Sequence, residues 1–138
     1  MVSKKETNCN DLGNLVLRTI AMPKDTNFNG DIFGGWLLSQ MDLAGVSLCN
    51  NVSYGRYVTM TIDRMVFRKP VKVGDIVEIM GKINKVGNTS IEVDLLVQAT
   101  TMETGKKKQV TEGTIKYVKI DTLGSPTAID SFKTQEYH

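Results

Sequence analysis

The stretch NFNGDIFGG at residues 27–35, followed by WLLSQMDLAGVSLCNNV at residues 36–52, decides the fold of this chain. In the second segment apolar residues recur at helical spacing and cover most of the circumference, which predicts a helix buried on nearly every side. The first segment is rich in Asn, Asp and Gly and predicts a loop that ends at Gly34 and Gly35, where the helix begins. The helix holds a single charged residue, Asp42. Because a buried carboxylate is costly unless it is satisfied, Asp42 is the first candidate functional residue.

The segments around this helix have the pattern of β-strands bounded by turns. We expect strands at residues 14–22, 57–67, 76–86, 89–101 and 109–121. In the second strand the apolar residues at 58, 60 and 62 alternate with polar residues at 59, 61 and 63, so the two sets face opposite sides. The dipeptide Gly87-Asn88 predicts a two-residue hairpin turn.

One strand, one long helix and four strands in antiparallel succession predict an α+β domain. We expect a single domain over residues 1–138, with its core at about residues 14–121 and a polar, loosely attached tail at residues 122–138. One sheet covers a helix on one side only. A helix that is apolar all round therefore needs a second surface, which a partner subunit supplies most simply. We expect a homodimer at least.

Composition excludes several classes of protein. A net charge of +2 over 138 residues is too small for a protein that coats nucleic acid, and no apolar stretch approaches the ~20 residues of a membrane span. Residues 1–10 lack the apolar centre of a signal peptide. Cys9 and Cys49 have neither metal-ligand spacing nor a disulfide framework. We expect a cytoplasmic protein with reduced thiols that binds neither nucleic acid nor membrane.

The only histidine, His138, is the last residue. A Ser-His-Asp or Cys-His nucleophile system therefore has no suitable base, and no Gly-x-Ser-x-Gly elbow is present. A metal site built on imidazole is equally disfavoured. Any chemistry must use carboxylates, amides, hydroxyls and backbone dipoles.

Several blocks of sequence together resemble a known family. They are residues 27–36 and 39–42, the turn F67xxPxxxGD75, the hairpin K85VGxxS90 and the closing strand to Asp121. The chain resembles the hotdog fold, a curved antiparallel sheet wrapped around one long central helix, and within it the bacterial acyl-CoA hydrolases of the YciA type. The resemblance implies hydrolysis of acyl-CoA thioesters to a free acid and CoA, no separate cofactor, and assembly as a trimer of dimers.

The resemblance also assigns roles to residues. It implies that Asp42 is the catalytic carboxylate and that Asn27 assists it from a neighbouring subunit. Many relatives carry His where this chain has Phe33, so a polar role at that position is absent. The nucleotide end of CoA binds near the turn after the second strand in such enzymes, which favours Arg68 and Lys69 as phosphate ligands.

The residues support this mechanism independently. Unpaired N–H groups at a helix start, beside glycines that allow close approach, are suitable donors to a thioester oxyanion, and Gly34 and Gly35 provide them. Asp42 lies eight residues beyond Gly34, roughly 12 Å along a helix at ~1.5 Å per residue. If both groups act on one carbonyl, they must come from different subunits. Asp42 then acts as general base, the role we favour, or as nucleophile.

Structural roles remain open for each acidic and amide residue in this region. Asp42 is satisfied by hydroxyls such as that of Ser39 if it has no chemical role. Asp63 is a rival acid on its strand, Asp31 caps the helix or pins the loop, and Asn29 can replace Asn27 as the amide.

Substrate contacts are expected around two turns. Arg64, Arg68, Lys69 and Lys72 carry the charge that suits CoA phosphates, with Arg68 and Lys69 preferred. We expect further backbone and hydroxyl donors at the hairpin of Gly87, Asn88, Thr89 and Ser90, which we expect to lie beside that basic turn. We expect Thr59 to contact the substrate as well. The pocket for the acyl chain is lined by Trp36, Met41 and Met60 unless these residues belong to the core.

Two other functions compete with the thioesterase. A non-catalytic acyl-CoA-binding hotdog module keeps the helix but normally lacks its carboxylate. A hotdog hydratase or dehydratase needs an imidazole beside its acid, and His138 does not supply one.

Overall fold

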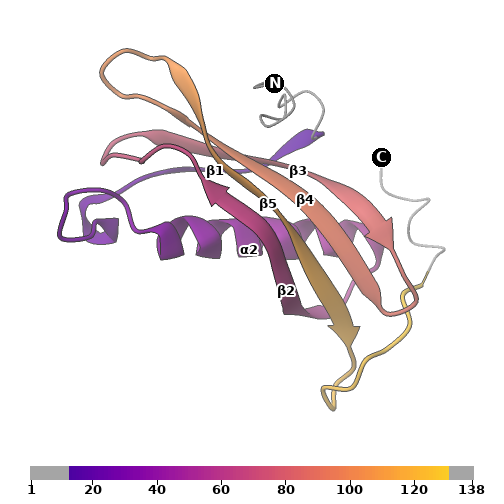
Figure 1. The fold of residues 1–138 in the computed structure, drawn as a ribbon. Coiled ribbons are helices and arrows are strands. Elements are labelled where there is room, and N and C mark those ends of the chain that lie inside the picture. Colours follow the sequence, from indigo (N-terminus) through magenta and orange to yellow (C-terminus); the bar gives the residue numbers. More distant parts are fainter. Residues whose placement is uncertain (1–12, 131–138) are drawn as a thin grey trace.

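The structure, a computed structural model, describes residues 13–130 as one five-stranded antiparallel sheet and one long helix (Figure 1). The predictions that concern the first ten residues, Cys9 and His138 lie outside the described residues. In chain order the elements are β1 (Asn14–Ile20), the 3₁₀ helix η2 (Pro23–Asp25), α2 (Gly34–Val52), β2 (Arg56–Phe67), β3 (Ile76–Val86), β4 (Ser90–Thr100) and β5 (Lys107–Ile120). The strand order is β1-β3-β4-β5-β2, so β1 and β2 are the edges of the sheet.

Every predicted strand and the helix are confirmed, with bounds that differ by at most two residues. The helix begins at Gly34, so both glycines lie in its first turn rather than before it. The β3–β4 turn is one residue later than predicted. Gly87 N–H donates to the Ser90 carbonyl at 2.7 Å, which leaves Asn88 and Thr89 at the tip.

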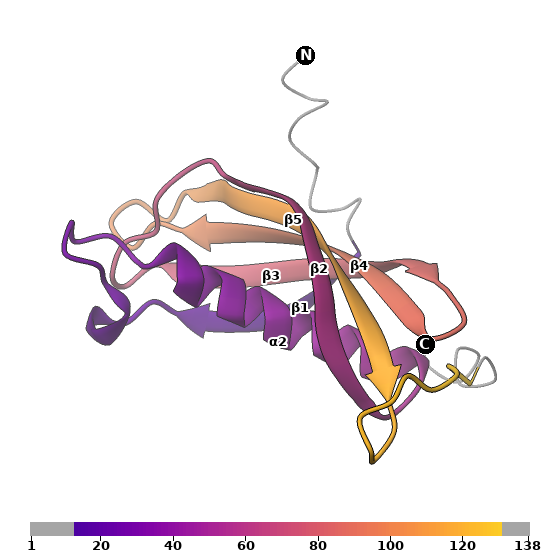
Figure 2. The same ribbon diagram turned by 60° about the horizontal axis from the view of Figure 1, so that its bottom comes forward.

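The core lies between α2 and the concave face of the sheet. Figure 2 shows the sheet curving around α2, which packs against all five strands. The helix buries Leu37, Met41, Ala44, Cys49 and Val52 against this face. Burial raises the pKa of the Cys49 thiol to about 12. The opposite side is not covered, and Leu43 is 60% exposed. The prediction that one sheet covers only one side of the helix is confirmed.

Edge strand β2 keeps its apolar residues exposed. Val58, Met60 and Ile62 are 38%, 57% and 43% exposed. Two irregularities interrupt its pairing with β5, between Thr59 and Thr61 and between Asp63 and Val66. Such bulges bend a strand and redirect its side chains. Thr59 pairs with Tyr117 and Ile62 pairs with Ile115, so both lie on the helix side of the sheet, while Asp63 lies on the other side. The prediction that residues 59, 61 and 63 share one face is therefore wrong, because the first irregularity changes the alternation.

The segment after β5 is attached more firmly than predicted up to residue 130. Asp121 N–H donates to the Ser125 carbonyl, Thr127 N–H to Lys119 and Ile129 N–H to Asn88, all at 2.8–2.9 Å. The side chain of Ile129 packs on the core. This segment therefore follows β5 and reaches the β3–β4 turn, and the expectation of a loose tail is wrong for residues 122–130.

A glycine in the middle of α2 allows the helix to approach the sheet. A Cβ atom built on Gly45 would lie 2.0 Å from the hydroxyl oxygen of Tyr117, which is fully buried on β5. Glycine costs about 1 kcal/mol relative to alanine inside a helix, so its presence has a packing reason. The missing side chain at Gly45 leaves the space that the Tyr117 ring occupies.

We therefore expect Gly45→Ala to lower the free energy of unfolding by about 2 kcal/mol, since the overlap outweighs the gain in helix propensity. Urea denaturation at fixed protein concentration measures this change in the free energy of unfolding. Gly35→Ala is the matched control, because nothing lies within 4 Å of a Cβ at that position. Equal stability of the two variants would contradict the packing role of Gly45.

Candidate active site

Asp42 is held by two hydroxyl groups from the sheet. Its Oδ1 atom accepts hydrogen bonds from the Thr59 hydroxyl at 2.7 Å and from the Tyr117 hydroxyl at 3.0 Å. Ser39, the partner considered from the sequence, instead donates to the Trp36 carbonyl at 2.7 Å. The half-buried carboxylate therefore lies where α2 meets β2 and β5.

Tyr117 is the site residue that the sequence did not reveal. Its hydroxyl also donates to the Asp42 backbone carbonyl at 3.0 Å. Burial, followed by the charge and hydrogen bond of Asp42, raises the pKa of Tyr117 far above its ordinary value. The phenol therefore stays protonated and acts as a donor. The available signal was Gly45, because a glycine inside a helix often faces a bulky side chain.

The N-terminus of α2 is open. Trp36 and Leu37 N–H groups both donate to the Phe33 carbonyl, at 3.1 and 3.3 Å. Within residues 13–130, no acceptor faces the N–H groups of Gly34 and Gly35. Phe33 occupies the N-cap position and offers no side-chain hydrogen bond. Two oriented donors at Gly34 and Gly35 therefore remain available to a ligand.

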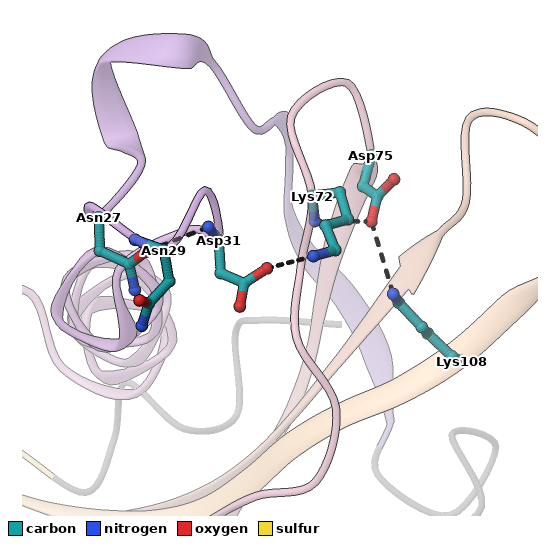
Figure 3. A network of polar contacts seen from close by, with 6 residues as sticks. All are labelled: Asn27, Asn29, Asp31, Lys72, Asp75 and Lys108. Carbon is teal, nitrogen blue, oxygen red and sulfur yellow. Dashed lines mark hydrogen bonds and ion pairs between the residues drawn. The ribbon is translucent and has the colours of Figure 1, made fainter.

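The loop before α2 is tied together by side chains (Figure 3). The Asn27 Oδ1 atom accepts from the N–H groups of Asn29 and Asp31, at 2.9 and 3.1 Å. Asp31 forms an ion pair with Lys72 on the β2–β3 connection. Asp31 therefore pins the loop and does not cap the helix. The amide nitrogen of Asn27 is the part of its side chain left to assist a ligand.

Buried Asp75 holds the β2–β3 connection, which carries Lys72 of the Asp31–Lys72 ion pair. Its Oδ2 atom accepts from the Lys72 backbone N–H at 3.0 Å and lies 3.7 Å from Lys108 Nζ (Figure 3). Its Oδ1 atom accepts from Met102 N–H at 3.3 Å. The loop at the helix start is thus connected through the β2–β3 connection to the β4–β5 hairpin.

A groove of about 300 Å³ brings several predicted residues together. It is lined by Asn27, Asp31, Ile32, Gly34, Leu37, Phe67, Arg68, Lys69, Pro70 and Val71. Arg68 also forms an ion pair with Glu112 at 3.1 Å, and Lys72 is engaged by Asp31. The helix start, the loop amide and two of the predicted phosphate ligands therefore share one groove.

Other predicted residues are kept apart. The hairpin at residues 87–90 and the connection that holds Arg68 and Lys69 lie at opposite ends of β3, whose 11 residues span roughly 35 Å at ~3.3 Å each. The expectation that they are neighbours is wrong within one protomer, because one strand separates them. Asp42 likewise lies two turns of helix from Gly34.

The remaining candidates divide between the core and the other face of the sheet. Asp63 lines a groove with Glu92, Thr114 and Lys116. Since Ile115 and Tyr117 of the same strand point to the buried side, this groove lies on the opposite face from Asp42. Asp63 is therefore not placed to replace Asp42.

The proposed acyl-chain residues also differ in environment. Met41 is fully buried in the core, Trp36 packs partly against it, and Met60 is exposed on β2. Met41 therefore belongs to the core.

Two further features concern the whole described part of the chain. No helix among residues 13–130 is long and apolar enough to cross a membrane. Nor do these residues bring together three or more His, Cys, Asp or Glu side chains that could hold a metal ion.

Comparison with known proteins supports a family assignment. The sequence profile of the thioesterase superfamily matches residues 29–106, more than half of the chain. The acyl-CoA thioester hydrolase YciA of Escherichia coli strain K12 is 44% identical over 120 residues, which cover 85% of this chain and 91% of that protein. An uncharacterized acyl-CoA thioester hydrolase of Haemophilus influenzae is 42% identical over 127 residues, covering 90% and 82%.

Solved structures agree. HI0827, a hexameric broad specificity acyl-coenzyme A thioesterase, superposes with a TM-score of 0.84 at 39% identity, covering 91% of this chain and 88% of that one. Cj0915, a hexameric hotdog fold thioesterase of Campylobacter jejuni, gives 0.85 at 38% identity, covering 92% and 98%. The chain therefore has the hotdog fold and belongs to the thioesterase superfamily, within the YciA group of acyl-CoA thioester hydrolases.

Proposed function

We propose that this protein is an acyl-CoA thioesterase that hydrolyses fatty acyl-CoA to a free carboxylic acid and CoA. The observation that carries the proposal is a hydrogen-bonded carboxylate, Asp42, on a helix whose first turn presents the free N–H groups of Gly34 and Gly35. Hydrolysis of a thioester needs these two elements, a base for the attacking water and a site that stabilises the oxyanion. The names of the relatives point to the same substrate class.

In the proposed mechanism Asp42 removes a proton from a water molecule as that water attacks the thioester carbonyl. The oxyanion that forms accepts hydrogen bonds from the Gly34 and Gly35 N–H groups of a second subunit. Collapse of the tetrahedral intermediate breaks the carbon–sulfur bond. CoA leaves as a thiolate that takes up a proton, and the acyl group leaves as the carboxylic acid. Direct attack by Asp42 to form an anhydride is the alternative route.

The need for a second subunit follows from distance. Along one helix, Asp42 and Gly34 are separated by roughly 12 Å at ~1.5 Å per residue, and a single carbonyl cannot reach both. Edge strand β2 exposes Ile62 on the helix side of the sheet, and the uncovered side of α2 exposes Leu43 next to Asp42, an apolar surface that suits a second copy. We propose a homodimer across this surface, within an oligomer that resembles the hexamers of the solved relatives.

Substrate binding is proposed on the same basis. Arg68 and Lys69 lie in the groove at the helix start, where they suit the phosphates of CoA. Gly87, Asn88, Thr89 and Ser90 can reach the same CoA only from another subunit, because β3 separates them from this groove.

The first test is release of free thiol from a panel of acyl-CoA chain lengths. We expect the wild type to hydrolyse several lengths and Asp42→Asn to lose about a hundredfold or more in kcat, the scale of general-base effects. Asp63→Asn, on the other face of the sheet, is the matched control and should keep its activity. A wild type that binds acyl-CoA without turnover would favour the non-catalytic acyl-CoA-binding module instead.

Gly35→Ala tests the helix start. Since nothing lies within 4 Å of its Cβ in the protomer, the variant should keep the thermal midpoint and oligomeric state of the wild type. We expect kcat to fall by about a hundredfold, because the added methyl group displaces the carbonyl from its donors. Ser39→Ala, at an exposed position on the same helix, should have no effect. Full activity of Gly35→Ala would remove the helix start from the mechanism.

Mixed oligomers test whether the site is shared. When Asp42→Asn and Gly35→Ala chains associate at random, about half of the dimers are mixed, and one of their two sites pairs an intact Asp42 with an intact Gly35. Co-expression of the two inactive variants should therefore restore about a quarter of wild-type activity, measured by thiol release. No recovery, with mixed oligomers verified by two affinity tags, would place both groups in one protomer.

A further inference from the structure

We propose that Tyr117 and Thr59 are positioning residues that select which oxygen of Asp42 reacts: they hold Oδ1 and leave Oδ2 to receive the proton of the attacking water. The inference rests on the proposed function and concerns the same site. It assigns a role to Tyr117, a residue that the mechanism above does not use.

The two oxygens of Asp42 have different surroundings. Oδ1 accepts from Thr59 at 2.7 Å and from Tyr117 at 3.0 Å, whereas Oδ2 has no hydrogen-bond donor among residues 13–130. Every buried polar side-chain atom of the described residues has a partner. Oδ2 is therefore open to solvent. An ionised carboxylate has about four acceptor positions, so the reactive oxygen keeps its capacity to bind water.

Tyr117 is itself fixed. Its side chain is fully buried, its single hydroxyl proton is shared between Asp42 Oδ1 and the Asp42 backbone carbonyl, and its ring fills the space above Gly45. The hydroxyl therefore cannot turn toward a substrate. A role as proton donor to the leaving thiolate is excluded by this geometry, although a tyrosine beside a catalytic acid invites that interpretation.

Two donors on the same oxygen restrict rotation of the carboxylate. Exchange of Oδ1 and Oδ2 would require both hydrogen bonds to break at once. With the carboxylate fixed, Oδ2 points constantly in one direction, which favours the alignment on which general-base catalysis depends.

The test compares Tyr117→Phe and Thr59→Val with the wild type by steady-state kinetics. We expect kcat to fall about tenfold in each variant while KM for acyl-CoA changes less than twofold, because the base is misaligned and the binding groove is intact.

Tyr57→Phe is the matched control. Tyr57 also donates its hydroxyl to a backbone carbonyl, that of Ser53, at 2.6 Å, and burial raises its pKa to about 12. It makes no hydrogen bond to Asp42. Loss of this hydroxyl should lower stability and leave kcat unchanged. Thr59→Ser retains a hydroxyl and should recover most of the kcat lost in Thr59→Val.

The outcomes separate this inference from the proposed function. If the wild type hydrolyses acyl-CoA and Asp42→Asn does not, but Tyr117→Phe and Thr59→Val keep the wild-type kcat, the positioning role is wrong and the thioesterase stands. If Asp42→Asn is as active as the wild type, the proposed function itself fails. Should Tyr117→Phe fail to fold, Thr59→Val and Thr59→Ser decide, since Thr59 is exposed.

Discussion

A rigid helix cannot fold back on itself, and the site depends on this constraint. The first turn of α2 and Asp42 are carried by one continuous rod, so their separation is fixed by helix geometry and not by loops or side-chain rotation. In the proposed mechanism the protomer thus holds two halves of a reaction centre that only a second copy can complete. The other arrangements of the fold, an uncovered side of the helix and an apolar edge strand beside Asp42, leave room for a second copy.

Packing and chemistry share the same contact between helix and sheet. Tyr117 is at once a core residue of β5 and a hydrogen-bond donor to Asp42, and Gly45 admits its ring. The helix–sheet distance that closes the core therefore also sets the position of the carboxylate. At the other end of α2, the Asp31–Lys72 ion pair and buried Asp75 connect the helix start to the loops around it. Each half of the centre is thus supported by contacts that are local to it.

The sequence predicted the order of strands and helix because periodicity and turn residues act locally. It also singled out Asp42 and the glycines at the helix start, since a charge inside an apolar helix and a glycine pair before it are visible in the chain itself. The partner of Asp42 was not predictable, because Tyr117 lies 75 residues away and only the register of β5 brings it near. The same limit explains why two turns expected to be neighbours lie at opposite ends of β3.

The segment at residues 121–130 has a consequence for how such proteins diverge. It runs back along β5, and Ile129 donates to Asn88, so this segment supports the tip of the β3–β4 hairpin. Ile91, directly after this hairpin, pairs with Tyr117 on β5, which donates to Asp42. A change in the length or sequence of the segment can therefore reach the surroundings of the carboxylate through two neighbouring strands, so the two regions are not free to vary independently.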